Sequence, residues 1–290
     1  MSSRDLFWYE DVVKEDFLLA HKTKTINQNM SISNDALKDV DSLVLTEAVK
    51  LKLLDRIKLQ EIWLLENTTI EGDLILVEDF KARNNINYTG DINALNVYFG
   101  HNTSLNGNFE AKDKFEIGNS AIITGDIKCT ELRIGENARV SGTITANEIY
   151  AGSNFYSDGN IKCTKFMTGE NSKLMGKNTI DYLYSQNGLN INGGQFLELH
   201  TDDNFKSKNS MSGNKLIMDN CVIINGNIKA KDYIRVGDKS VINGDVYCEN
   251  YLEFGPGTTF NGKKYSAKEK QLPPSSAKIR NQGPVHFAEF

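Results

Sequence analysis

The sequence is poor in the features that indicate a membrane span, a disulfide framework or secretion. It contains no apolar run of about 18 residues, so no membrane-spanning helix is expected. The opening residues, MSSRDLFWYEDVVKED, do not place a charged segment before an apolar one, so no secretory signal is expected. Four cysteines in 290 residues fit a reducing compartment, and we therefore expect a cytoplasmic protein.

Signals for chemistry are equally scarce. The chain has four histidines, and no Ser/His/Asp arrangement, HExxH, CxxC or phosphate-cradling loop stands out. We therefore assign no catalytic residue, cofactor or metal ligand, and we do not expect an enzyme. The 33 Lys and Arg residues against 38 Asp and Glu residues leave a mildly acidic chain without a basic stripe, so no nucleic-acid partner is expected.

Glycine at a fixed spacing is what the sequence does contain. A glycine followed by a small polar residue and then an apolar one recurs every 17 or 18 residues and reappears at Gly226 and Gly244. Self-similarity at a short, constant period indicates a solenoid. The first run of these glycines comprises Gly72, Gly90, Gly107, Gly125, Gly142 and Gly159.

A repeat of this length accommodates three short strands and three tight corners, whereas helical repeat units are about twice as long. Alternating runs such as Leu252-Glu253-Phe254 point every second side chain inward. The corners carry Gly, Asn and Asp, which tolerate a positive φ or bond back to the backbone. We therefore predict an all-β, single-stranded parallel β-helix of roughly twelve coils, stacked about 4.8 Å apart.

The repeat divides the chain into three parts. We expect a partly disordered N-terminal extension, then the β-helix, then a disordered tail, over residues 1–41, 42–265 and 266–290. Within the β-helix the pattern blurs around residues 200–215, where we expect one irregular coil or an excursion. Residues 35–50 can also be read at helical spacing, so a helical cap is the alternative there.

Two columns of residues could carry chemistry but have simpler interpretations. Cys129 and Cys163 occupy the same position of the same phrase, IKCT, two coils apart, and Cys248 falls in the equivalent position. We interpret these cysteines as small inward-facing residues of a stacked core. The acids that follow repeated glycines are interpreted as turn residues rather than as a carboxylate site; they are Asp73, Asp91, Asp126 and Asp245.

These repeats resemble the bactofilins, which are bacterial polymer-forming cytoskeletal proteins. The resemblance lies in the Gly-Asp/Asn-Ile corners, the phrases LRIG (132–135) and VINGDV (241–246), and a closing coil LEFGPGTTFNGK (252–263) with Phe260 at its aromatic position. The resemblance implies a right-handed, triangular β-helix that polymerises end to end without a nucleotide. It also implies a filament, often on the inner membrane, that scaffolds cell-wall or shape factors.

The ends of the rod are the expected site of self-assembly. A β-helix ends in unpaired strand edges and a slice of apolar core, which invite another rod. The candidate residues are Leu252, Phe254 and Phe260 at one end and Leu43, Leu45, Leu51 and Leu53 at the other.

The extension begins with a compact apolar-aromatic group, Leu6, Phe7, Trp8 and Tyr9. We expect it either to pack over the first coil or to anchor the protein to a membrane or partner. The expected partners are other copies of the chain and, through the two tails, the inner membrane or cell-wall and shape proteins.

Two other functions stay open from the sequence. One is a monomeric β-helix binding module or adhesin that contacts its ligand through the N-terminal extension and residues 200–215. The other, less expected, is a carbohydrate-active enzyme on the same fold. Sedimentation at increasing protein concentration separates a polymer from both, and a glycan turnover screen separates the last two.

Overall fold

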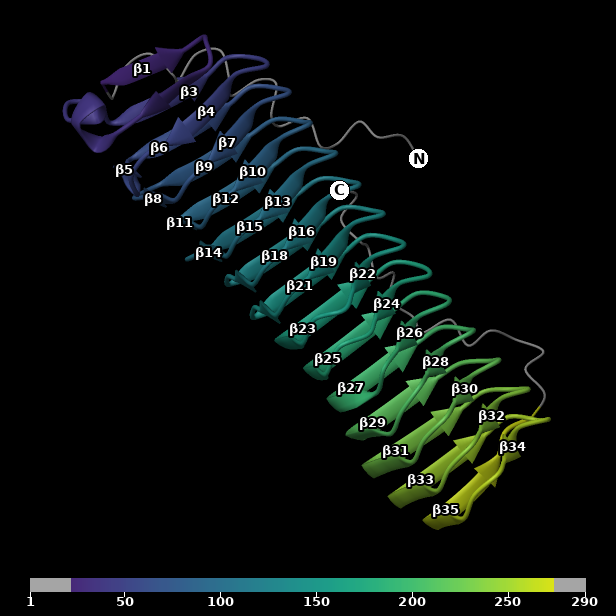
Figure 1. Ribbon diagram of the computed structural model, residues 1–290. Helices are drawn as coiled ribbons and strands as arrows, with labels where there is room; N and C mark the ends of the chain where they lie inside the picture. Colours follow the sequence, from purple (N-terminus) through teal and green to yellow (C-terminus); the bar gives the residue numbers. More distant parts are fainter. Residues whose placement is uncertain (1–21, 274–290) are drawn as a thin grey trace.

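The computed structural model describes residues 22–273, which form one continuous rod of stacked coils (Figure 1). Its strands pair in parallel in two sheets, one of 21 and one of 14 strands across this described part of the chain. The rod has about 15 turns, and at about 4.8 Å per coil it is roughly 65–70 Å long. The predicted all-β parallel β-helix is confirmed, although the expected number of coils was too low.

Each coil has three sides, which we number in chain order. The first side is built from four-residue strands in the N-terminal half: β1 (Thr23–Ile26), β3 (Ser42–Leu45), β6 (Glu61–Leu64), β9 (Asp79–Ala82), β12 (Asn96–Phe99), β15 (Lys114–Ile117), β18 (Glu131–Ile134) and β21 (Glu148–Ala151). The third side is built from shorter strands: β5 (Ile57–Leu59), β8 (Leu74–Leu76), β11 (Ile92–Ala94), β14 (Phe109–Ala111), β17 (Ile127–Lys128) and β20 (Ile144–Thr145).

The second side is the 14-stranded sheet. Its strands are β2 (Met30–Ile32), β4 (Lys50–Leu53), β7 (Thr69–Glu71), β10 (Asn87–Thr89), β13 (Ser104–Asn106), β16 (Ile122–Thr124), β19 (Arg139–Ser141), β22 (Tyr156–Ser157), β24 (Lys173–Leu174), β26 (Asn190–Ile191), β28 (Lys206–Ser207), β30 (Ile223–Ile224), β32 (Val241–Ile242) and β34 (Thr259–Phe260).

From residue 161 onward the corner between the third and first sides becomes continuous strand. One long strand then supplies the third side of one coil and the first side of the next, which merges those two sides into the 21-stranded sheet. These long strands are β23 (Ile161–Thr168), β25 (Asn178–Ser185), β27 (Gly194–Thr201), β29 (Met211–Met218), β31 (Ile228–Val236), β33 (Val246–Phe254) and β35 (Lys264–Gln271).

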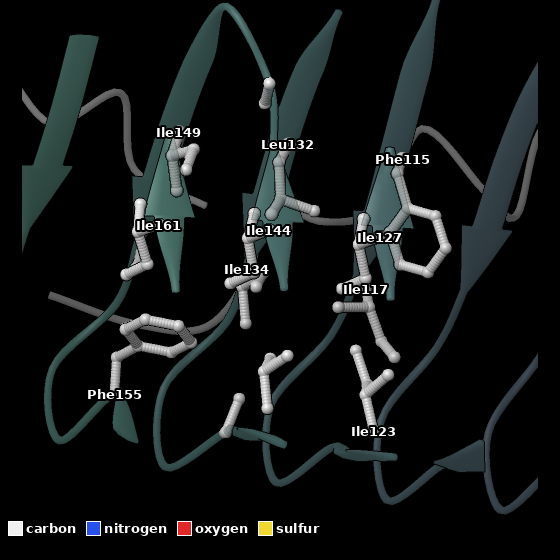
Figure 2. Close-up of a cluster of buried hydrophobic side chains, with 14 of the residues drawn as sticks. Phe115, Ile117, Ile123, Ile127, Leu132, Ile134, Ile144, Ile149, Phe155 and Ile161 are labelled. Carbon is white, nitrogen blue, oxygen red and sulfur yellow. The ribbon is translucent and has the colours of Figure 1, made fainter. Parts of the chain in front are cut away.

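The core is a set of columns of identical or similar side chains that run along the rod. Ile127 stands in register with Ile144, and Ile144 with Ile161, and all three are buried. Figure 2 shows these residues and their neighbours pointing into the interior from successive coils. Full burial of an isoleucine contributes about 1.5–3 kcal/mol, so the alternating sequence pattern stabilises every coil in the same way.

The repeated glycine lies at the corner between the second and third sides. A Cβ on Gly107 would meet the carbonyl oxygen of Gly90 at 1.9 Å, and a Cβ on Gly125 would meet that of Gly107 at 1.9 Å. Both residues also have a positive φ, of 149° and 127°. Glycine recurs because stacking places the carbonyl of the preceding coil where a side chain would begin.

The polar residue after that glycine hydrogen-bonds to the next coil. The Asp126 carboxylate accepts the backbone N–H of Thr143 at 2.7 Å, and Asp91 accepts that of Asn108 at 2.8 Å. Asp245 accepts the N–H of Lys263 at 2.8 Å in the same way. These acids therefore satisfy backbone donors at a corner, in line with their interpretation as turn residues.

The corner between the first and second sides uses a left-handed residue instead of a close glycine contact. Asn137 and Asn154 have φ of 57° and 60°, and the Asn154 amide donates to the Asn137 side-chain oxygen at 3.1 Å. Asparagine is suited to this position because its short side chain tolerates a positive φ. Its recurrence is therefore a second periodic signal; the other asparagines are Asn67, Asn85, Asn102, Asn171 and Asn204.

The observed rod is longer than the expected range of 42–265. β1 pairs with β3 and β2 pairs with β4, so residues 23–41 form a first coil rather than part of an extension. At the other end β35 continues pairing with β33 to Gln271. The sequence hides these coils because their inward register positions are partly polar, which breaks the alternation used to find strands.

The stretch around 200–215 forms paired coils rather than an excursion, with one irregularity, a register shift between Gly213 and Lys215 where β29 pairs with β31 (Ile228–Val236). Residues 194–201, 206–207 and 211–218 are strands paired on both sides, and Ser207 is buried at the inward position of β28. Gly213 occupies another inward position, in register with Phe196 and Ala230. Small and polar inward residues explain why the pattern blurs while the coil persists.

The helical cap that was the alternative for residues 35–50 does not form. The stretch contains one short 3₁₀ helix, η2 (Asn34–Leu37), followed by β3 and the start of β4. A helix of that length would have displaced the second coil. The apolar-aromatic group at Leu6–Tyr9 and most of the expected tail lie outside the described residues.

Candidate self-assembly ends

The N-terminal end consists of β1, β2 and η2. Ile26, Ile32 and Leu37 close the core here and are buried to 6% exposure or less. The 3₁₀ turn takes the place of a third-side strand, and Asn34 fixes it by donating its backbone N–H to Asp55 and its amide to the Arg56 carbonyl. Across the described residues, β1 and β2 each have a strand partner on one side alone.

The four leucines expected at this end are interior residues. Leu43, Leu45, Leu51 and Leu53 belong to the second coil and are 0–6% exposed, because the first coil covers them. They therefore cannot form the end surface themselves. Lys24 stands in register with Leu43 and donates its ammonium to the Ala36 carbonyl at 3.2 Å. A lysine thus occupies one of the two inward register positions of β1, and the buried Ile26 occupies the other.

The C-terminal end has a similar arrangement. Leu252 is fully buried, since β35 adds one more strand beyond it, and it is therefore excluded from the end surface. Phe254 and Phe260 stay half-buried and pack edge to face, with ring centroids 5.4 Å apart and an interplanar angle of 81°. Of the three residues expected here, these two remain accessible.

A charged pair lies over these two aromatic rings. The Lys264 ammonium is 4.7 Å from the centroid of Phe254 and 5.1 Å from that of Phe260, and it forms an ion pair with Glu269 at 2.8 Å. Lys264 is in register with Val246 and Glu269 with Leu252, so both occupy core positions of the last strand. The C-terminal end is therefore amphipathic. It combines the two aromatic rings with the Lys264 ammonium that covers them, the Glu269 carboxylate and the open edge of β35.

The sequence did indicate that a charged residue occupies a core position in the last strand. Gly262-Lys263-Lys264 aligns with Gly244-Asp245-Val246, so Lys264 takes the inward position that Val246 holds in the preceding coil. Aligning the last repeat position by position would have identified Lys264 as a core-position cation. The equivalent role of Lys24 was harder to find, because the first coil lacks the glycine that sets the register.

The cysteines pack as interpreted. Cys163 and Cys248 are buried and Cys129 is half-buried, and all four cysteines are free. Burial raises the pKa of the Cys129 and Cys163 thiols to about 12. A thiol with that pKa is protonated at neutral pH and a poor nucleophile or metal ligand.

The two histidines of the rod are held by structural contacts. His101 Nδ1 accepts the backbone N–H of Asn119 at 2.8 Å, as side chains at this corner do in other coils. His200 stacks on Tyr184 at 5.1 Å and lies 3.3 Å from the Glu198 carboxylate, and burial lowers the pKa of its imidazole. Residues 22–273 bring together no group of three or more His, Cys, Asp and Glu side chains suited to a metal ion.

Comparison with known proteins matches part of the chain to a protein family. Residues 97–195 match the bactofilin family model, described as polymer-forming cytoskeletal. The resemblance to the bactofilins is confirmed. No curated protein and no solved structure gives a significant match. The bactofilin match runs from β12 into β27, so both end surfaces lie beyond it.

The bactofilin family and the β-helix together support a structural, cytoskeletal role. The description of the family as polymer-forming also supports self-association. Within the described residues, no helix is long and apolar enough to cross a membrane.

Proposed function

We propose that this protein is a cytoskeletal subunit that stacks through the two ends of its β-helix into nucleotide-independent filaments. The observation that carries the proposal is the pair of end coils described above. Each presents strand edges with a partner on one side within residues 22–273, and the C-terminal end adds the half-buried Phe254 and Phe260. An open edge is a template for further strand pairing, and a second rod supplies the matching edge.

The two ends differ, which favours a defined geometry of stacking. One end closes with a 3₁₀ turn and Lys24, the other with β35 and the Lys264–Glu269 pair. Contact between unlike ends repeats without closing and gives a filament, whereas contact between like ends must alternate along it. Backbone hydrogen bonds and burial of the end coils supply the association energy in either case, so no nucleotide is required.

The rest of the proposal concerns what the filament carries. Residues 1–21 precede the first described coil in the sequence and residues 274–290 follow the last, so each segment is joined to an end at which rods would stack. We propose that they recruit cell-envelope or shape factors, or the cytoplasmic face of the inner membrane, to a cytoplasmic scaffold.

The test is sedimentation combined with negative-stain electron microscopy of the full-length protein and of Phe260→Arg. The substitution replaces a half-buried ring at the end coil with a charge, which disfavours a desolvated contact. We expect filaments from the parent chain and short, folded species from the variant. Ile223→Arg is the matched control, because Ile223 is 38% exposed on the second side, two strands before the last strand of that sheet.

The outcomes separate the parts of the proposal. A parent chain that stays monomeric at high concentration would contradict filament formation and favour the monomeric binding module. Filaments that persist in Phe260→Arg would leave polymerisation intact but remove the C-terminal end as its contact. Circular dichroism of each variant establishes that the β-helix is folded before the comparison is made.

A further inference from the structure

Three exposed tyrosines lie on the last two long strands at the C-terminal end of the rod, β33 and β35. Tyr247, Tyr251 and Tyr265 are 43%, 42% and 48% exposed, and we call them the tyrosine patch. Tyr247 and Tyr265 are neighbours on the third side with ring centroids 6.5 Å apart, and Tyr251 lies on the first side, beyond the corner at residues 249–250. Exposed tyrosines such as the neighbouring Tyr247 and Tyr265 are typical of interfaces, because each offers a rigid ring and a hydroxyl together.

Two lysines lie against rings of the patch and give it positive charge at those points. The Lys229 ammonium is 5.4 Å from the centroid of Tyr247, and the Lys268 ammonium is 5.1 Å from that of Tyr251. Both lysines are neighbours of these tyrosines in the strand register. The cations hold the rings in place and are themselves open to an acidic ligand.

We propose that the tyrosine patch binds residues 1–21 of another copy of this chain. That segment carries five acidic and two basic residues around the group Leu6–Tyr9, so it offers both negative charge and aromatic side chains. The other segment outside the described residues, 274–290, carries two basic residues and one acidic residue and does not complement the lysines. Acidic residues opposite Lys229 and Lys268, with aromatic rings opposite the tyrosines, match in charge and in apolar character.

Chain length requires the contact to be made between copies. Tyr9 is 13 residues from Lys22, where the described rod begins, and an extended chain of that length spans at most about 45 Å. On the first side β33 lies thirteen strand steps from β1, which is about 62 Å along the rod. The aromatic group therefore cannot reach the patch of its own rod. The inference rests on the proposed function only in that stacking would bring a neighbour's first coil close to this patch.

The test uses a labelled synthetic peptide of residues 1–21 and a full-length receptor whose own residues 1–21 are weakened as a ligand. In the receptor, Phe7→Ser, Trp8→Ser and Tyr9→Ser weaken the resident segment, so the patch is free. We expect saturable binding by fluorescence anisotropy, at least tenfold weaker when Tyr247→Ser, Tyr251→Ser and Tyr265→Ser are added. Tyr182→Ser is the control, since Tyr182 is similarly exposed on the first side of β25 and should leave binding unchanged.

Several results would overturn the inference. They are absence of peptide binding, binding that survives the three tyrosine substitutions, and binding that the Tyr182 control reduces equally. A peptide that binds anionic vesicles but not the receptor would identify a membrane anchor instead. Sedimentation of the unsubstituted parent chain is measured in parallel. Filaments without peptide binding contradict this inference alone, whereas peptide binding without filaments contradicts the proposed function alone.

Discussion

Replacing Gly125 by alanine should destabilise the rod more than any surface substitution. A Cβ at this position would lie 1.9 Å from the carbonyl oxygen of Gly107, and Gly125 has φ of +127°. The close contact is to backbone, so relief requires one coil to shift against the next. The strained φ costs about 1–2 kcal/mol, and overpacking adds about 1–3 kcal/mol, which gives about 2–5 kcal/mol in total.

Gly257→Ala separates these two contributions. Gly257 has φ of +73°, but the nearest atom to its added Cβ is Lys239 Cγ at 3.7 Å, so the φ cost remains and the clash is absent. At about 2–4 °C per kcal/mol, Gly125→Ala should lower the midpoint of thermal unfolding by about 4–20 °C, and Gly257→Ala by about 2–8 °C.

The assay is far-UV circular dichroism at a protein concentration where sedimentation shows no assembly. Equal shifts for the two variants would refute the stacking argument, because they would leave φ alone as the reason for the glycine repeat. A Gly125→Ala variant too unstable to purify would be compared by expression and limited proteolysis with Gly257→Ala.

Two further predictions concern the corners and the core. Asp126→Ala removes the acceptor of the Thr143 N–H at 2.7 Å and should cost about 1 kcal/mol in unfolding free energy, whereas Asp126→Asn keeps an acceptor oxygen and should be near neutral in urea titrations. An equal loss in both variants would show that charge rather than acceptance matters. Cys221, which is exposed, should react with iodoacetamide at neutral pH while Cys129 and Cys163 do not, because burial raises their pKa to about 12. Mass spectrometry before and after unfolding checks this, and rapid modification of Cys163 in the folded protein would contradict its buried placement.

Much of the fold could be predicted because the same physical requirement recurs in every coil. The glycine at the second corner is needed wherever one backbone carbonyl stacks on the next, so Gly107 and Gly125 reveal the period directly. The alternation around Ile127 and Ile144 marks the inward side for the same reason. Coils whose inward positions hold Ser207 or Gly213 do not show this alternation, although neighbouring coils on both sides hold them in the stack.

The end surfaces of the rod were predicted less well, because a coil is terminal when no further coil pairs with it. Leu43 and Leu252 resemble end residues in the sequence but are covered by one further coil each. The residues that do lie at the ends, Lys24 and Lys264, resemble ordinary surface lysines until strand pairing assigns them core positions.

The sequence by itself determined the period, the strand class, the corner chemistry and the resemblance to the bactofilins, because each is a local requirement repeated many times. Only the tertiary structure decided where the rod begins and ends and which residues its end surfaces expose. It also decided that the exposed rings of Tyr247 and Tyr265 are neighbours. The physical reason is register: parallel stacking brings together residues 17 or 18 positions apart, and the pairing of each strand decides whether a side chain is core or surface.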